Sequence, residues 1–255
     1  MSNLLEVKGL TKRFGGVVAV NHVDFHVGKG EIVAVIGPNG AGKTTLFNMI
    51  SCFIPPSDGK VYYKGNLLTG KKIYELAPLG ISRTFQNLQI FQNMSVLENI
   101  MMGAHVKLKT KVLSAGFRLP VVKKDEELSY QSALQAIEMM GLEKVMHEKA
   151  GQLSYGIQKQ IEFARAVMYE PELILLDEPM AGLNDTDTNR MSEYIVEYKK
   201  KGCSFLFVEH KMAAVMEIAD RIVVIDFGQK IAEGTPAEIQ RNEKVIKAYL
   251  GEEVV

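Results

Sequence analysis

One glycine-rich segment near the N-terminus constrains this chain more than any other part of its sequence. The apolar run Ile32–Ile36 leads directly into Gly37–Thr45, which reads G-P-N-G-A-G-K-T-T, and a helix-compatible stretch follows. A glycine-rich loop between a buried strand and a helix turns successive backbone N–H groups toward phosphate oxygens, and the helix adds the positive end of its dipole. In this pattern Lys43 reaches the β- and γ-phosphates, and the Thr44 hydroxyl binds Mg²⁺. The sequence therefore predicts a nucleoside triphosphate site made by Gly37, Asn39, Gly40, Ala41, Gly42, Lys43, Thr44 and Thr45.

Composition indicates a globular protein with a large core. Of 255 residues, 47% are hydrophobic, and 30 acidic residues balance 30 basic ones. A protein that binds nucleic acid through bulk electrostatics has an excess of basic residues, so this class of partner is not expected. No apolar run approaches the roughly 20 residues that span a membrane, and no signal-peptide pattern opens the chain. Because Cys52 and Cys203 also lack metal-ligand spacing, we expect a cytoplasmic protein that reaches a membrane only through a partner.

Hydrophobic patterning divides the chain into an α/β core and an inserted helical part. Alternating apolar residues between Leu5 and Val27 predict two or three antiparallel strands before the phosphate loop. Helical spacing replaces strand runs after residue 87, and an exposed helical or loop insertion is expected at 106–124. The later elements that we expect are buried strands at 173–176 and 205–208, a helix between them, a hairpin at 221–232 and a closing helix at 239–250. The chain is thus predicted to be one domain over 1–255, with a core at 1–86 and 167–255 and a helical subdomain at about 87–166.

Two acidic residues directly follow the apolar run Leu173–Leu176. Asp177 and Glu178 stand at the carboxyl end of this predicted parallel strand, where open α/β sheets bind their ligands. Asp177 can bind Mg²⁺ through a water molecule there, and Glu178 can polarise a water molecule in line with the γ-phosphate. The alternative is a strand end with ordinary surface carboxylates. The phosphate loop earlier in the chain favours the functional interpretation.

Two further segments allow both a functional and a structural interpretation. Ser154 precedes apolar residues at helical spacing, so it predicts a helix start where its hydroxyl and the Gly156 N–H can bind an anion. A capped core helix is the alternative for this segment. His210 follows the predicted strand Phe205–Val208, where it can sense the γ-phosphate, although a lone histidine after a strand is more often a structural hydrogen-bonding residue.

In their order and spacing, these motifs resemble the nucleotide-binding subunits of ATP-binding cassette (ABC) transporters over nearly the whole chain. The resemblance implies an ABC ATPase fold, in which a P-loop α/β core carries an N-terminal antiparallel β subdomain and an inserted α-helical subdomain. It assigns Gly37–Thr45 to the Walker A loop, and Asp177 and Glu178 to the Walker B aspartate and the catalytic glutamate. Further roles implied in this way are an adenine-stacking Phe14, a Q-loop Gln86 that contacts Mg²⁺ and senses the γ-phosphate, a signature motif with Ser154 and Gly156 that contacts ATP on the opposite subunit, and a switch His210.

The chain departs from the common family pattern at two motifs. The signature commonly reads Leu-Ser-Gly-Gly-Gln, whereas Tyr155 and Ile157 take its third and fifth positions here. The D-loop carries Ala181 and Asn184 in place of the usual serine and aspartate. Because Ser154 is retained, phosphate contact is expected to persist. The departures are expected to change ribose or subunit contacts and to weaken coupling across the dimer.

Within the family, the chain looks most like the ATPase subunits of branched-chain amino acid importers. The features that carry this resemblance are Arg83–Gln86, Met94–Asn99, the insertion before Leu153, the D-loop Ala181–Asn184 and the ending Val245–Glu252. It implies an ATPase coupled to transport, in which two subunits clamp two ATP molecules with Mg²⁺. It also implies two membrane-spanning permease subunits, a solute-binding protein as an indirect partner, and a position on the inner face of the cell membrane.

An apolar set after Gln86 is expected to form partly a groove for a short permease helix and partly core. Its members are Leu88, Ile90, Phe91, Met94, Val96 and Leu97. The alternative functions are ATP hydrolysis for another solute or lipid transporter, a non-transport ABC ATPase acting on ribosomes or DNA, and a phosphate-loop kinase of a small molecule. The sequence leaves open the solute, the direction of transport, and whether the partner ATPase is a second copy.

Overall fold

A six-stranded sheet forms the centre of the molecule in the computed structural model, which describes residues 3–107 and 120–250. In spatial order its strands are β10 (Gln229–Gly234), β9 (Arg221–Asp226), β3 (Ile32–Ile36), β8 (Ser204–Val208), β7 (Leu173–Asp177) and β6 (Ile81–Arg83). The strands from β9 to β6 pair in parallel, and β10 pairs with β9 as an antiparallel hairpin. The predicted buried strands and the hairpin are therefore confirmed.

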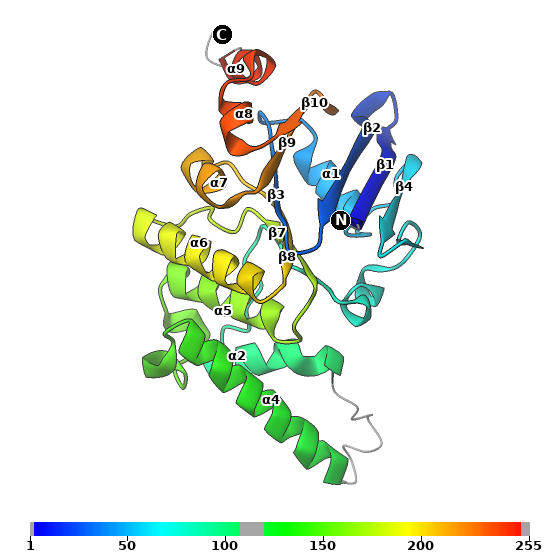
Figure 1. Cartoon of the computed structure of the whole chain (residues 1–255). Helices are drawn as coiled ribbons and strands as arrows, with labels where there is room; N and C mark the ends of the chain where they lie inside the picture. The colour runs from blue at the N-terminus through cyan, green and yellow to red at the C-terminus, as the bar shows by residue number, and fades with distance from the viewer. Residues whose placement is uncertain (1–2, 108–119, 251–255) are drawn as a thin grey trace.

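A second, antiparallel sheet lies beside the first (Figure 1). Its order is β2 (Val17–Gly28), β1 (Asn3–Phe14), β4 (Asp58–Tyr63) and β5 (Asn66–Leu67). Two antiparallel strands thus precede the phosphate loop. The apolar residues at 17–20 and 23–27 lie in one strand, β2, so no third antiparallel strand forms there. β3 joins the parallel sheet, as expected for a run that is apolar without alternation and buried at all five residues.

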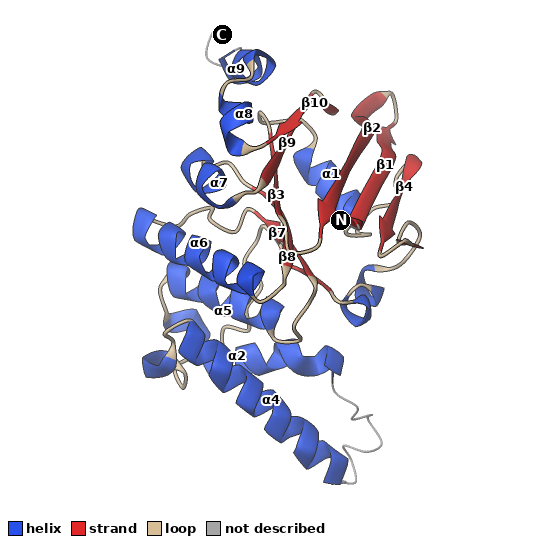
Figure 2. Ribbon diagram, in the orientation of Figure 1, coloured by secondary structure: helices blue, strands red, loops and turns tan. Residues whose placement is uncertain are grey.

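Helices are the other regular elements of the described structure, and Figure 2 shows them together with the connecting loops around the central sheet. The α-helices are α1 (Lys43–Ile50), α2 (Val96–Met101), α4 (Pro120–Met139), α5 (Tyr155–Val167), α6 (Asp185–Lys200), α7 (Met212–Ile218), α8 (Pro236–Gln240) and α9 (Glu243–Leu250). Short 3₁₀ turns are η1 (Ile73–Glu75), η2 (Ala77–Leu79), η3 (Met102–Lys107), η4 (Glu143–Val145) and η5 (Ala150–Gln152). Between β6 and β7 the named elements that the structure describes are all helical. None of the described helices is both long and apolar enough to cross a membrane.

Strands of the parallel sheet send alternate side chains into two separate cores. Ile174 and Phe205 pack with α2, α4 and α5 in one core. Leu175 and Leu206 pack with α1 and the antiparallel sheet in the other. A strand covered on both faces must be apolar at every position, which explains the continuous apolar runs in the sequence. The sheet thereby fixes α1 on one face and α5 on the other.

Two expectations about helices need comment. The closing helix predicted at 239–250 is wrong in its boundaries, because α8 ends at Gln240 and α9 begins at Glu243. Asn242 separates them, and its side-chain oxygen accepts the Lys244 backbone N–H at 3.0 Å, which starts a new helix. Most of the insertion expected at 106–124 lies outside the described residues, although α4 begins at Pro120.

Candidate nucleotide-binding site

The phosphate loop joins β3 to α1, and its backbone lies against neighbouring strands. Gly37 has a φ of 153°, and a Cβ there would stand 1.9 Å from the Ile225 carbonyl oxygen. A Cβ on Gly42, at the start of α1, would stand 2.3 Å from the Ala19 carbonyl oxygen. Only glycine fits at such approaches, so chain packing and phosphate access impose the same residue type. The N-terminus of α1 faces the loop and can stabilise a bound anion.

Lys43 lies folded onto its own loop. Its ammonium donates to the carbonyl oxygens of Gly37 at 2.6 Å and Pro38 at 2.7 Å, and the residue is 5% exposed. Asn39, Gly40 and Thr44 are exposed, whereas Ala41 is buried and Thr45 half-buried. The tip of the loop and Thr44 are therefore exposed to solvent, and the Lys43 ammonium is held against the first two residues of the loop.

Asp177 is the last residue of β7 and is 4% exposed. Burial raises the pKa of its carboxyl above the ordinary aspartate value, and the Arg83 guanidinium, 3.6 Å from Oδ2, opposes that shift. The backbone N–H of Asp177 faces the Thr84 hydroxyl oxygen at 3.4 Å. Sequence reasoning did not single out Arg83 as a partner of this carboxylate.

Three predicted polar residues meet directly beyond the strand ends. Glu178 Oε2 accepts a hydrogen bond from the Gln86 amide nitrogen at 3.1 Å, and Glu178 Oε1 lies 3.0 Å from His210 Nε2. These residues follow β7, β6 and β8, which are neighbours in the sheet. Glu178 has a positive φ of 50°, a conformation that turns the chain sharply after Asp177. The Gln86 amide and the His210 imidazole thus both contact the Glu178 carboxylate.

Glu209 is a functional candidate that the sequence analysis did not name. Its carboxylate is buried and accepts backbone N–H groups of Met180 at 2.7 Å, His210 at 2.6 Å and Lys211 at 3.2 Å. Glu209 therefore holds the segment that follows β8 in contact with the segment that follows β7. An acidic residue that directly follows a buried strand is the signal that could have identified it.

The signature segment lies at the start of α5. Ser154 caps this helix, with the Ile157 N–H 3.5 Å from its hydroxyl oxygen. The helix packs against α2, α4 and β6, whereas α1 packs on β1, β2 and β8. Ser154 and Gly156 thus stand in a different layer from the phosphate loop of the same chain.

The signature contacts the D-loop at Gly182 and α6 at Gly156. A Cβ on Gly182 would lie 3.0 Å from the ring of Tyr155, which is 42% exposed. A Cβ on Gly156 would lie 2.3 Å from an Asp187 carboxylate oxygen. Asn184 caps α6 by accepting the Asp187 N–H at 2.8 Å, so it provides the cap that an aspartate would otherwise provide.

A buried ion pair on α5 holds the segment after Gln86. Lys159 and Glu162 lie 3.4 Å apart, with side chains only 2% and 5% exposed. Glu162 also accepts the Gln89 backbone N–H at 3.1 Å, and Arg165 donates to the Gln89 carbonyl oxygen. Burial raises the pKa of Glu162. The helix that begins with the signature is therefore bonded to the Q-loop.

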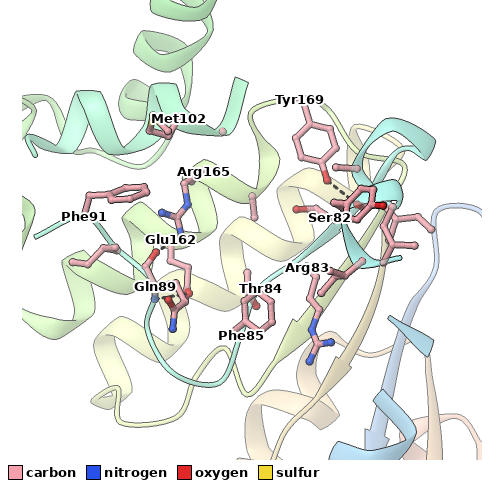
Figure 3. A pocket seen from close by; sticks show the side chains of 18 residues that line it. Ser82, Arg83, Thr84, Phe85, Gln89, Phe91, Met102, Glu162, Arg165 and Tyr169 are labelled. Atoms are coloured by element: carbon pink, nitrogen blue, oxygen red, sulfur yellow. Dashed lines mark hydrogen bonds between the residues drawn. The ribbon is translucent and has the colours of Figure 1, made fainter. Parts of the chain in front are cut away.

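A groove of about 790 Å³ opens beside this contact. Figure 3 shows Phe91, Met102, Glu162 and Arg165 around one part of it, and Tyr169 lines another part. Of the apolar set expected there, Ile90 and Phe91 line the groove. Val96 and Leu97 are buried in the core, whereas Leu88 and Met94 are half-buried. Exposed Tyr74 and Met102 complete the lining from elements that the sequence analysis did not connect with it.

Phe14 ends β1 away from these residues and is 51% exposed. The ammonium of Lys12 lies 5.2 Å from its ring centre. An exposed aromatic face beside a cation is suited to stacking against a flat ring system.

Comparisons with known proteins extend over the same motifs. The chain matches the ABC transporter family over residues 20–181, and it matches the branched-chain amino acid ATP-binding cassette transporter family over residues 229–255. It is 41% identical over 250 residues to the high-affinity branched-chain amino acid transport ATP-binding protein BraF of Pseudomonas aeruginosa, with 98% of each chain covered. LivG of Escherichia coli, a protein of the same description, is 40% identical over 250 residues, again with 98% of each chain covered.

Solved structures give the same result. A crystal structure of the ADP conformation of an ATP-binding cassette of an ABC transporter superposes with a TM-score of 0.85 and 34% identity, covering 98% of this chain and 100% of that one. A nucleotide-free ATP-binding cassette from an ABC transporter gives a TM-score of 0.84 at 34% identity, covering 97% of this chain and 99% of that one. The chain therefore belongs to the ABC transporter family of ATP-binding proteins, and within it resembles those of branched-chain amino acid transport.

Proposed function

We propose that this chain is the ATP-hydrolysing subunit of a transporter that imports branched-chain amino acids. The observation that carries the catalytic part is the meeting of Gln86, Glu178 and His210 at the carboxyl ends of adjacent strands. The transported solute is inferred from relatives that match nearly the whole chain and are named as branched-chain amino acid transport proteins.

Glu178 is the general base in this proposal. Its carboxylate oxygens are directed by the Gln86 amide and the His210 imidazole, so one of them can accept a proton from a water molecule that attacks the γ-phosphate. His210 can donate to the developing phosphate charge. Lys43 would exchange its loop carbonyl partners for phosphate oxygens, which are stronger acceptors because they are charged.

The residues around the loop also suit Mg²⁺. The Thr44 hydroxyl, the Asp177 carboxylate and the Gln86 amide oxygen are hard oxygen donors, and a site with one carboxylate takes its remaining ligands from phosphate and water. Among the described residues, no cluster of three acidic, histidine or cysteine side chains could hold a metal by itself, consistent with that mode. Bound Mg²⁺ would neutralise charge on the transferring phosphate.

Two copies, or this chain and a related subunit, would enclose the nucleotides. Ser154 and Gly156 stand in a different layer from the phosphate loop, so their anion site is available to ATP bound on a partner. Phe14 would stack on adenine from the side of the loop. The residues at 87–166 would approach the partner as a unit when ATP binds.

The groove beside α5 is the proposed docking surface for a permease subunit. It is largely apolar and lined by exposed aromatic and methionine side chains, which suits the helix-in-groove mode of recognition. Docking there would hold this chain against the inner face of the membrane. A negative charge introduced at exposed Tyr74, as Tyr74→Glu, should reduce transport while leaving ATP hydrolysis by the isolated chain unchanged, and transport at the normal rate would exclude the groove.

The central experiment replaces Glu178 with glutamine, which keeps the shape and both neighbours but removes the base. ATP affinity should be retained, and turnover should fall by about 10²–10⁴. Lys43→Ala is the matched comparison, because it should weaken nucleotide binding itself. Near-normal hydrolysis by Glu178→Gln would remove this residue from the role of base.

The same variant tests the partner. Light scattering of Glu178→Gln with Mg-ATP should show a mass of twice the 28.4 kDa chain if two copies clamp ATP. A monomer with ATP bound would instead require a different ATPase subunit or the permeases for assembly.

A further inference from the structure

Arg83 occupies a buried position between α1 and the end of β7. Its side chain is only 7% exposed. The guanidinium carbon lies 4.8 Å from the ring centre of Phe85 and 5.4 Å from those of Phe47 and Phe53. Figure 3 shows it at the edge of the groove, with its guanidinium directed away from Glu162 and Arg165. A charged group with so little water around it needs specific partners.

Those partners are two neutral acceptors and one carboxylate. The guanidinium donates to Asn48 Oδ1 at 2.6 Å and to the Ser51 hydroxyl, and a terminal nitrogen lies 3.6 Å from Asp177 Oδ2. Its Nε is buried without a partner. Asn48 on α1 and Ser51 at its C-terminus orient the planar group, and Asp177 supplies the one carboxylate among these three partners.

The sheet register explains why this pair can form. β6 and β7 are parallel neighbours, and Arg83 is paired with Leu175, two residues before Asp177. Side chains two residues apart lie on the same face of a sheet, so a long arginine side chain from β6 reaches the end of β7. Asp177 is itself 4% exposed, and without Arg83 its buried carboxylate would keep only the weaker attraction of Lys159.

We propose that Arg83 is the resident counter-ion of Asp177, a positioning residue that holds this carboxylate while no divalent cation is bound and opposes the cation when it binds. The inference rests on the metal-binding role of Asp177 in the proposed function. Two cations facing one carboxylate repel each other, so the guanidinium lowers the affinity of the site for Mg²⁺. The same contact keeps the Asp177 carboxylate in place between turnovers, while no divalent cation is bound.

The experiment measures Mg²⁺ rather than activity. The full chain with saturating ADP is melted over a series of MgCl₂ concentrations, and the concentration that gives half of the Mg²⁺-dependent stabilisation is the midpoint. Arg83→Gln keeps a donor for Asn48 and Ser51 but removes the charge. It should lower the midpoint by about tenfold, equivalent to about 1.4 kcal/mol, and should lower the melting temperature without Mg²⁺ by about 2–4 °C. A purely structural role would lower the melting temperature without moving the midpoint.

Two further variants complete the test. Asp177→Asn should raise the midpoint, and adding Arg83→Gln to it should cause no further change, because the counter-ion then has no carboxylate to oppose. Arg83→Lys keeps a charge but loses the planar fork, so it should lower the midpoint less than Arg83→Gln. If Arg83→Gln does not fold, this Lys variant gives the same sign at smaller size.

The outcomes separate the two claims. If Asp177→Asn leaves the midpoint unchanged, the metal role of Asp177 fails, and the inference fails with it. If Asp177→Asn raises the midpoint but the charge-removing Arg83 variant raises it or leaves it unchanged, only the counter-ion role is overturned. The counter-ion role is also overturned if Arg83→Gln shifts the Mg²⁺ midpoint by the same factor in the unaltered chain and in Asp177→Asn.

Discussion

The two ends of the proposed ATP site are built in different ways. At the phosphate loop the backbone approaches other backbone directly, since a Cβ on Gly37 would stand 1.9 Å from the Ile225 carbonyl oxygen. At the signature end side chains fill the space, as where the Tyr155 ring packs on Gly182. Where backbone packs on backbone, few residue types are tolerated, so the site produces a motif that is recognisable in the sequence. A site built from side chains can change two contacting residues together and so depart from a family pattern.

This difference gives the signature departures a physical meaning. Tyr155 replaces a residue that is commonly glycine, and its ring lies where the D-loop carries no side chain. Asn184 replaces an aspartate but still caps α6. The two segments therefore contact each other within one chain, and the weaker coupling expected across the dimer stays a prediction.

The largest effect is expected from removing the buried carboxylate of the signature helix. Glu162→Ala removes the ion-pair partner of Lys159, whose side chain is 2% exposed. It should lower the free energy of unfolding by about 3–5 kcal/mol, because a buried charge that loses its partner retains its desolvation cost. Urea denaturation measures this loss.

The control for that experiment replaces both members of the pair with apolar residues. Lys159→Met combined with Glu162→Leu should recover most of the lost stability, since no charge then remains buried. If Glu162→Ala costs less than about 1 kcal/mol, the ion pair does not hold the helix.

The phosphate loop should be sensitive at one glycine and tolerant at another. Gly37→Ala forces its Cβ against the Ile225 carbonyl, so we expect a loss of about 2–3 kcal/mol in unfolding free energy and a weakened ATP affinity. Gly40→Ala is the matched control, because no heavy atom lies within 4 Å of its Cβ and its φ of +76° leaves only backbone strain. Urea denaturation and nucleotide titration should show the larger loss for Gly37→Ala. Equal losses of stability and affinity in the two variants would contradict the packing of the loop backbone against the Ile225 carbonyl.

The sequence predicted the fold class and the positions of most strands because these depend on local pattern. Continuous apolar runs identified β3, β7 and β8, and residues at strand ends then necessarily gather at one edge of the sheet. The proximity of Glu178 to Gln86 and His210 follows from that rule. Their catalytic roles remain predictions.

Contacts between distant side chains could not be predicted in the same way. The pairing of Arg83 with Asp177 depends on strand order, and the groove combines residues from η1, β6 and α5. The break between α8 and α9 depends on one capping residue, Asn242, inside a run whose composition is helical throughout. Pair contacts of this kind depend on which elements become neighbours, and a pattern along one chain does not contain that information.

A smaller effect should come from the contact between the signature and the D-loop. Gly182→Ala meets the Tyr155 ring at 3.0 Å and has a φ of +76°. We expect a loss of about 1–2 kcal/mol in unfolding free energy. Gly65→Ala isolates the backbone term, because its φ is +75° and no heavy atom lies within 4 Å of its Cβ. Equal costs at the two glycines would show that the tyrosine contributes no packing constraint.

The smallest effect concerns alkaline pH and one tyrosine between α5 and α6. Burial raises the pKa of Tyr198 on α6 to about 12, from an ordinary value of 10.0, with its ring 5.7 Å from that of Phe163. A raised pKa means that the folded state holds the proton more tightly than the unfolded chain. This contribution to stability is therefore complete below about pH 10 and is lost as the pH rises toward 12. Tyr198→Phe has no such proton, so between pH 9 and 11 it should lose about 1 kcal/mol less unfolding free energy than the unaltered chain. Denaturation at several pH values measures this difference, and equal slopes for Tyr198→Phe and the unaltered chain would mean that Tyr198 does not contribute to the alkaline loss of stability.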